Sequence, residues 1–463
     1  MNERSGNILI NNIVKVLMSN FWVIVLGFSG SFIFPKILSI DSYAQYQTFL
    51  LYSSYVVLLP LGFPSGMVIN YAGLNYHDIN NSQYKTEIYI LFVILSIFTV
   101  ICGGITMILH NRMWLYVTLA IFPICMVGSY RALYQAWNRF SSFTRLNVLI
   151  ATAIPMLAII YYLVTKNLTG DIYIYIYLSI YLIVTIYLIF EFKEKTRGVS
   201  ANKVFTKYNW ETEKAGFALF VGSYINILLL SADKQFVNVF FSVEIFAFYA
   251  FGMSMQSIMT SFITSISQPL FPAMAQKRFS RDDYKKLKEI LLIFGSASGC
   301  SYFVVSIIVK HFITKYIEGL RVAEIFFIVF PALAVINILY INLYKIERKM
   351  KTYITTLAGV FGTAIILNLL AVHFIDDFTG VAVATTITYY VWFFVGTKQF
   401  DYFKLTVGDI AFLCVYIAGL LLITRSCNDF VGIIVYLIFD VVLAFICYGK
   451  NFKDYLKLYR QQS

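Results

Sequence analysis

Long apolar segments separated by short polar turns run through the whole chain and decide what it can fold into. A helix needs roughly 20 mostly apolar residues to cross a bilayer, and such a helix satisfies its backbone hydrogen bonds internally. The sequence predicts fourteen spans, near residues 8–38, 43–73, 86–109, 113–136, 143–164, 172–190, 216–241, 243–274, 287–311, 322–344, 353–374, 378–397, 407–423 and 430–448. The predicted fold class is therefore an all-α polytopic membrane protein with about 14 transmembrane helices.

The composition indicates that lipid surrounds most of this chain. Apolar residues make up 59% of it and charged residues 13%, which leaves more apolar surface than a water-soluble core can bury. A net charge of +12 would suggest nucleic acid as the partner of a soluble protein, but in a membrane protein the placement of the charges matters more. The six cysteines and four histidines have no paired or ligand-type spacing. We therefore expect no disulfide framework, no metal site and no catalytic residues.

Two short segments repeat one another and divide the chain into similar halves. Ser39–Tyr46 and, 203 positions later, Ser242–Tyr249 share the pattern Ser, β-branched, acid, any residue, aromatic, Ala, any residue, Tyr. A second pair, Ile121–Pro123 and Val329–Pro331, recurs at an offset of 208. Many transporters are built from two such repeats around a central site.

The duplication predicts four parts of the chain. They are an N-terminal six-helix lobe over residues 1–191, a cytoplasmic linker over 192–214, a C-terminal six-helix lobe over 215–400, and an appended helix pair with a basic cytoplasmic tail over 401–463. The two lobes are expected to be pseudo-symmetric.

The positive charges are distributed unequally between the two ends of the spans. By the predicted topology, 28 of the 36 Lys and Arg residues lie on or near the side that holds both termini and seven on the other, with Lys234 inside a span. An excess of positive charge marks the cytoplasmic side, so both termini are expected to be cytoplasmic. We also expect residues 276–288, which are rich in Lys and Arg, to form a short helix on anionic headgroups.

Charged residues inside spans are the best indicators of mechanism, since each costs about 2.5 to 3.5 kcal/mol at the bilayer centre on insertion scales. Asp233 and Lys234 lie in the seventh predicted span, on a stripe of polar residues that includes Asn226. One interpretation is a cavity wall in which Lys234 and Asn226 bind an anionic substrate and Asp233 binds a coupling ion. The alternative is a structural pair that a neighbouring helix neutralises.

Two further basic residues lie near the predicted cytoplasmic ends of their spans, Arg131 in the fourth and Lys15 in the first. Both are candidate substrate contacts, because they can add positive charge to the inner mouth of the same cavity. The alternative is that their side chains reach the headgroups. Asp440, mid-span in the last helix, is expected to make a structural contact.

The chain resembles the bacterial polysaccharide and O-antigen flippases of the multidrug, oligosaccharidyl-lipid and polysaccharide exporter superfamily. The resemblance depends on the corner at Asp41 and on Leu61–Gly66, Ser231–Phe236, Phe241–Glu244, Phe248–Ala250 and Leu270–Pro272. It implies two six-helix lobes in a V around a cationic cavity, in a bacterial inner membrane. It also implies flipping of a polyprenyl-diphosphate-linked oligosaccharide, an O-antigen or capsule repeat unit, to the outer leaflet by alternating access.

The same resemblance implies what the protein works with. Expected partners are the lipid-linked oligosaccharide, the bilayer and other membrane proteins of polysaccharide and lipopolysaccharide assembly, and nucleic acid is not expected. No cofactor is expected, and the coupling ion is left open between H⁺ and Na⁺. Lys234 stands where many relatives carry Arg, which keeps the charge but loses a bidentate grip on phosphate.

Two other functions remain open at this point. A membrane-embedded polysaccharide polymerase or glycosyltransferase would need acid, base or metal groups held outside the membrane, and the predicted outward loops are short. A small-molecule extruder of the same superfamily would carry cations, for which a cavity with a lysine is poorly suited. We therefore expect a transporter and not an enzyme.

Overall fold

The computed structural model describes residues 22, 25–27, 30–72, 74, 76–202, 207–276, 281–400 and 405–460, and within these ranges all regular structure is helical. The chain divides into two compact units, Met1–Ser231 and Ala232–Ser463. The division falls inside α8 (Lys207–Phe240), so one helix belongs to both units. The lobe limits expected from the sequence stay a prediction.

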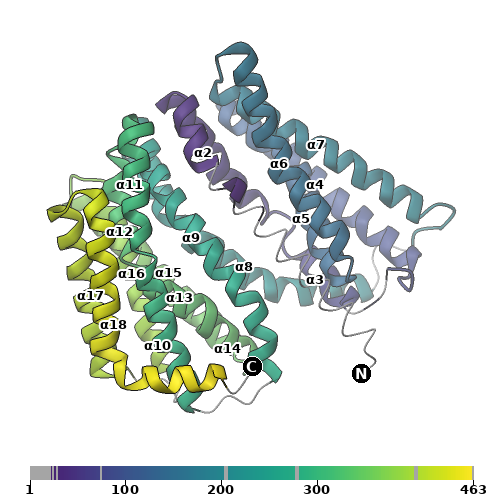
Figure 1. Ribbon diagram of the computed structural model, residues 1–463. Coiled ribbons are helices and arrows are strands. Elements are labelled where there is room, and N and C mark those ends of the chain that lie inside the picture. The colour runs from purple at the N-terminus through teal and green to yellow at the C-terminus, as the bar shows by residue number, and fades with distance from the viewer. Residues whose placement is uncertain are drawn as a thin grey trace. The chain divides into compact units, whose positions relative to one another are not determined.

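The first unit is built around a single buried helix, α5 (Arg112–Ala136). Around it pack α2 (Ile40–Val56), α3 (Phe63–Tyr71), α4 (Asn81–Leu109), α6 (Phe140–Thr165) and α7 (Gly170–Lys195). More than half of the residues of α5 are buried, including Ile121 and Pro123, which belong to the second pair of repeated segments. Figure 1 labels these helices along the chain.

The second unit also has a central span, but this one is broken. It consists of α12 (Gly319–Phe327), α13 (Phe330–Val335), the π-helix η2 (Ile336–Tyr340) and α14 (Ile341–Ile346), with a bend of 54° between α12 and the helix that starts at Phe330. Nearly every residue from Val322 to Tyr344 is buried. Proline at the start of α13 has no backbone N–H to donate to the preceding turn, which favours a break there.

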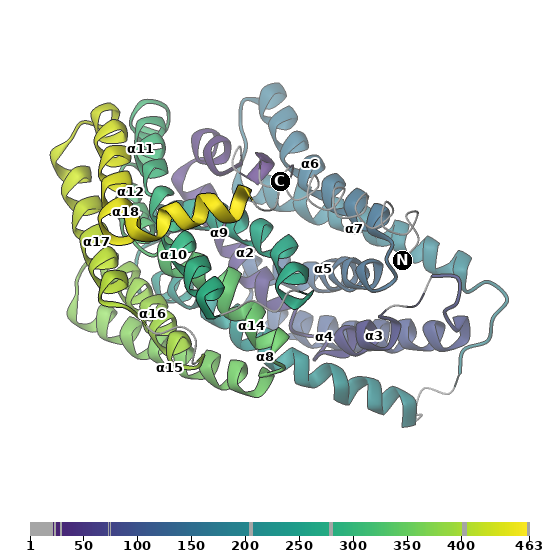
Figure 2. The same cartoon turned by 60° about the horizontal axis from the view of Figure 1, so that its bottom comes forward.

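The remaining helices of the second unit pack around this broken span. They are α9 (Val243–Gln276), α10 (Arg281–Ala297), α11 (Cys300–Phe312), the 3₁₀ turn η1 (Thr314–Tyr316), α15 (Met350–Phe374), α16 (Thr379–Lys398), α17 (Val407–Ser426) and α18 (Asp429–Arg460). Contacts pair α15 with α16 and α17 with α18, as Figure 1 and Figure 2 both show.

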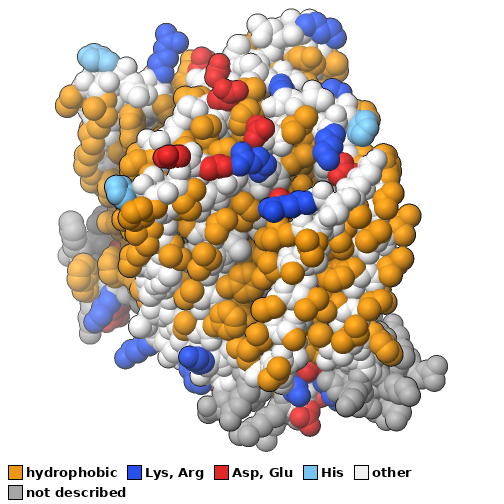
Figure 3. Space-filling model, turned by 90° about the vertical axis from the view of Figure 1, so that its left-hand side faces the viewer, with side chains coloured by type: hydrophobic (Ala, Val, Ile, Leu, Met, Phe, Trp, Pro, Cys, Tyr) orange, Lys and Arg blue, Asp and Glu red, His pale blue; other side chains and the backbone are white. Residues whose placement is uncertain are grey.

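The length and composition of the helices agree with a multi-pass membrane protein. Among the described residues, nine helices are long and apolar enough to cross a bilayer, and the bent pair makes a tenth. On the face over α17 and α18, hydrophobic side chains fill a broad band, and charged side chains gather toward its ends (Figure 3). Leu422 of α17 and Ile434 and Phe445 of α18 are among the exposed large hydrophobic residues of these two helices. Such a surface is stable against lipid and not against water.

The repeated corner has the same helix-starting geometry in both units. Ser39 precedes α2, and its side chain accepts a hydrogen bond from the backbone N–H of Ser42 at 3.1 Å. Ser242 precedes α9, and its side chain accepts from the N–H of Ile245 at 3.3 Å. An acid in the first turn complements the helix dipole in each copy, Asp41 in one and Glu244 in the other.

Within the first unit, two glycines allow α3 and the start of α8 to approach one another closely. Gly62 precedes α3 at φ 93°, a left-handed conformation that favours glycine. A Cβ on Gly216 would lie 2.1 Å from the carbonyl oxygen of Gly62 and 2.5 Å from the backbone nitrogen of Gly66. The backbones of α3 and α8 therefore touch at a place where no side chain fits.

A buried ion pair attaches the last two helices to the second unit. Lys288 of α10 lies 2.6 Å from Asp409 of α17, and both side chains are fully buried. Tyr448 of α18 donates to the other carboxylate oxygen at 3.0 Å. The expectation that residues 276–288 lie on the membrane surface is thus wrong for Lys288, because a carboxylate far away in the sequence compensates its charge.

Candidate functional site

Asp233 is the most deeply buried of the candidate site residues that the structure describes. Its side chain is only 2% exposed on α8. One carboxylate oxygen accepts from the backbone N–H of Lys234 at 2.7 Å, and the other accepts from the hydroxyl of Tyr249 on α9 at 2.9 Å. Thr385 of α16 is a further hydrogen-bond partner. Three helices of the second unit therefore contribute to the binding of one carboxylate.

The polar surroundings of Asp233 extend past its direct partners. Tyr389, one turn after Thr385 on α16, is buried close enough to the carboxylate to interact with it electrostatically, and hydrogen-bonds Gln256 of α9. Gln256 is itself 5% exposed. The result is a cluster of oxygen and amide groups in a helical core that is mostly apolar. Such clusters are costly in a membrane protein and typically mark an ion or proton site.

Lys234 differs from its neighbour in environment. Its side chain is part-exposed, whereas Asp233 next to it is buried. Successive residues on a helix point about 100° apart, so the two side chains leave α8 in different directions. The ammonium still interacts favourably with the Asp233 carboxylate. The arrangement places a carboxylate held by protein groups next to a part-exposed lysine on the same helix.

The structure does not gather all the candidate residues into one cluster. Asn226 is part-exposed on the segment of α8 that belongs to the first unit. Arg131 lies on α5, also in the first unit, and its buried Nε has no hydrogen-bond partner among the described residues. Lys15 lies outside the described residues. Only Asp233 and Lys234 are therefore placed together.

Sequence analysis missed the groups that hold the Asp233 carboxylate. Tyr249 is the last residue of the repeated corner, so its position was visible, but its direction toward α8 was not. Thr385 belongs to the polar run Thr385, Thr386 and Thr388 inside a predicted span, a signal that could have been used. Within the described ranges, no group of three or more His, Cys, Asp or Glu side chains could hold a metal ion.

Several solved structures share this fold, among them a flippase and a multidrug transporter. Lipid II flippase MurJ in an inward closed conformation matches with a TM-score of 0.69 at 13% identity, over 95% of this chain and 99% of that chain. The MATE multidrug transporter DinF-BH in complex with R6G matches with a TM-score of 0.55 at 13% identity, over 86% of this chain and 97% of that chain. No family model and no curated protein sequence matches the chain. The expected all-α fold, which the chain shares with a flippase and a multidrug transporter of known structure, is confirmed.

Proposed function

We propose that this protein is a flippase that moves a polyprenyl-diphosphate-linked oligosaccharide, an O-antigen or capsule repeat unit, from the cytoplasmic to the outer leaflet by alternating access. The fold supports a transporter of this superfamily, and one neighbour in fold is named as a lipid II flippase. The observation that carries the proposal is the adjacent pair in α8, where Tyr249 and a backbone N–H hold the Asp233 carboxylate and Lys234 is part-exposed.

Lys234 has the main binding role in this proposal. A diphosphate carries about two negative charges, and at an effective dielectric near 20 a close charge pair is worth about 4 kcal/mol before desolvation is subtracted. Asn226 adds hydrogen bonds, while Arg131 and Lys15 add positive charge at the inner mouth of the cavity. The unpartnered buried Nε of Arg131 is compatible with such a role, because buried donors normally have partners.

Asp233 is the proposed site of ion coupling. A carboxylate surrounded by hydroxyl groups from Tyr249 and Thr385 can take up a proton or bind Na⁺, which prefers oxygen ligands. Uptake of either ion would neutralise Asp233 and leave the ammonium of Lys234 less balanced. Binding of the ion would thus be linked to the affinity of Lys234 for an anion.

Substitutions in α8 test this assignment. We expect Lys234→Ala and Asp233→Ala to abolish or strongly reduce glycan export at normal protein levels, and Lys234→Arg to retain most of it. Surface glycan is the measurement, with protein abundance in the membrane as the control. Export by Lys234→Ala equal to that of the parent would remove the cationic-cavity role from this position.

A membrane-embedded polymerase is the main competing function. Cells that lack a flippase should accumulate complete lipid-linked repeat units in the cytoplasmic leaflet. Cells that lack a polymerase should accumulate them unpolymerised on the outside. Labelling of the accumulated units with a probe that does not cross the membrane distinguishes the two functions, and external units would replace our proposal with the polymerase.

The proposed location is the bacterial inner membrane with both termini in the cytoplasm. We expect a reporter fused after Lys203 or at the C-terminus to read cytoplasmic, and one inserted at Asn167 or Asp377 to read external, because the basic residues favour one side. If Asn167 and Lys203 were found on the same side, the arrangement of six plus six helices would be wrong.

A further inference from the structure

A groove on the first unit lies outside the proposed transport site. It has a volume of about 390 Å³ and lies between α6 and α7 next to the end of α5. Its lining consists of Tyr134, Ser142, Arg145, Leu146, Leu149, Ile183, Val184 and Tyr187. Leu149, Ile183 and Tyr187 are each at least half exposed, so the groove opens to the surface of the helices.

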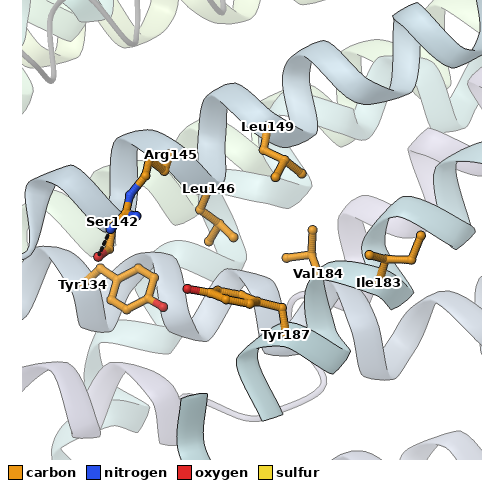
Figure 4. A pocket seen from close by; sticks show the side chains of 8 residues that line it. All are labelled: Tyr134, Ser142, Arg145, Leu146, Leu149, Ile183, Val184 and Tyr187. Atoms are coloured by element: carbon orange, nitrogen blue, oxygen red, sulfur yellow. Dashed lines mark hydrogen bonds between the residues drawn. The ribbon is translucent and has the colours of Figure 1, made fainter. Parts of the chain in front are cut away.

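The two ends of this groove differ in chemistry (Figure 4). Ser142, Arg145 and Tyr134 lie at one end and Leu149, Val184 and Ile183 at the other, with Leu146 between them. Arg145 is five residues after the start of α6, about 7.5 Å along its axis, and Leu149 is about 6 Å deeper. Along the axis of α6, the groove thus changes from a cationic, hydroxyl-bearing mouth to an aliphatic slot.

Arg145 is free to take an anion. It contacts the backbone oxygen of Ser141 at 3.4 Å and the hydroxyl of Ser142 at 3.5 Å, and both distances are long for hydrogen bonds. No carboxylate among the described residues lies within ion-pair distance of it. The nearby carboxylate of Glu191 is already taken by Arg139 and by the hydroxyl of Tyr134.

We propose that this groove binds an anionic glycerophospholipid of the surrounding leaflet, with the headgroup phosphate on Arg145 and one acyl chain along Leu146, Leu149 and Val184. Basic pockets between transmembrane helices are suited to anionic headgroups. The aliphatic slot below Arg145 gives the chain of the same lipid a place that matches the order of head and tail in a leaflet. The groove belongs to one unit, so this site stands independently of the transport proposal.

Native mass spectrometry of the purified full-length protein tests the site, with phosphatidylglycerol and phosphatidylcholine of identical acyl chains as probes. We expect the parent to retain phosphatidylglycerol preferentially. Arg145→Gln should weaken phosphatidylglycerol binding about fivefold, the value for one basic residue near a membrane surface. It should leave phosphatidylcholine binding unchanged. Leu149→Trp, which fills the slot, should reduce the binding of both lipids.

Lys193→Gln is the matched control, because Lys193 is exposed near the end of α7 and does not line the groove. It removes the same charge and should leave lipid binding unchanged. An equal loss in Lys193→Gln and Arg145→Gln would overturn the proposal in favour of diffuse attraction to the basic surface.

Tighter binding of a polyprenyl phosphate than of phosphatidylglycerol, lost in Arg145→Gln, would overturn the proposal in favour of the lipid carrier as the ligand. No effect of Leu149→Trp on either lipid would exclude the slot.

Discussion

The two copies of the repeated corner share their geometry and differ in the span that comes before them. Both begin a helix with a serine cap and an acid in the first turn, and both bury the aromatic residue and the alanine that follow. The duplication aligns Asp233 and Lys234 with Gly30 and Ser31. The capping residues have thus been kept in both halves, while the charged pair belongs to the second half alone.

The last tyrosine of the corner has different partners in the two halves, because only the second half has the charged pair. Tyr249 is fully buried and donates to the Asp233 carboxylate. Its counterpart Tyr46 is part-exposed and instead meets Tyr173 of α7, with 4.3 Å between ring centroids and a hydrogen bond between the side chains. The same residue therefore supports a charged group in one unit and an aromatic cluster in the other. Equivalent architecture does not imply equivalent chemistry.

The central spans make a second comparison. Pro123 lies inside the continuous helix α5, whereas Pro331 starts α13 after a bend of 54°. The broken span also contains the π-helix η2, a form that is frequent at functional sites. In the second unit, Ser267 of α9 hydrogen-bonds both Asn337 and Asn342 next to this irregular segment. The unit with the charged pair is also the unit with the less regular core.

The buried ion pair of the second unit should give the largest effect on stability. Lys288→Met would leave the Asp409 carboxylate buried without its cation, and we expect a loss of about 3 to 5 kcal/mol in the free energy of unfolding. Chemical unfolding in mixed micelles measures it. Lys349→Met is the control, because the side chains of Lys349 and its partner Glu347 are 44% and 25% exposed. Exposed pairs contribute about 0 to 1 kcal/mol.

A double variant separates charge from packing at the same place. In Lys288→Met with Asp409→Asn, the amide oxygen can still accept from the backbone N–H of Thr406, and the amide nitrogen can donate to Tyr448. We expect the double variant to recover most of the stability that Lys288→Met loses. If it is as unstable as the single variant, the loss comes from packing and not from an uncompensated charge.

The contact between α3 and α8 should give the next largest effect. Gly216→Ala places a methyl group against the backbone of Gly62 and Gly66, which cannot move like a flexible side chain. We expect a loss of about 1 to 3 kcal/mol, the usual cost of overpacking. Gly104→Ala is the control, because a Cβ there meets nothing within 4 Å. Equal unfolding midpoints for the two variants would show that the helices are not in contact at Gly216.

Removing the hydroxyl groups of the two corner tyrosines, Tyr249 and Tyr46, should give smaller losses of stability, which can be compared directly. Tyr249→Phe removes a hydrogen bond to a carboxylate, and Tyr46→Phe removes one between neutral groups. Hydrogen bonds to charged groups are the stronger kind, so Tyr249→Phe should cost about 1 kcal/mol more than Tyr46→Phe. Unfolding of both variants under identical conditions measures the difference. Equal losses would mean that Asp233 is uncharged in the folded protein under those conditions.

Sequence reasoning could predict the helices and the repeat, because both depend on local pattern. Apolar length defines a span, and a serine followed by an acid defines a helix start wherever they occur. The sequence could not distinguish Pro123 from Pro331, because whether a proline breaks a helix depends on the packing around it. It could not place Lys288 either. Its partner Asp409 lies 2.6 Å away in space but in a different predicted part of the chain.

Asp440→Asn should give the smallest effect on export and stability, although Asp440, like Asp233, is an acidic residue inside a predicted span. Asp440 is 5% exposed on α18, one carboxylate oxygen has no partner among the described residues, and Ser296 of α10 hydrogen-bonds the side chain. The substitution keeps the shape and one acceptor oxygen. We expect unchanged glycan export and a change in stability below the roughly 1 kcal/mol of a typical hydrogen bond, because the hydrogen bond with Ser296 can be kept. Loss of export in Asp440→Asn with normal protein abundance would mean that the last two helices take part in transport. The functional difference between the two halves would then not come from Asp233 and Lys234 alone.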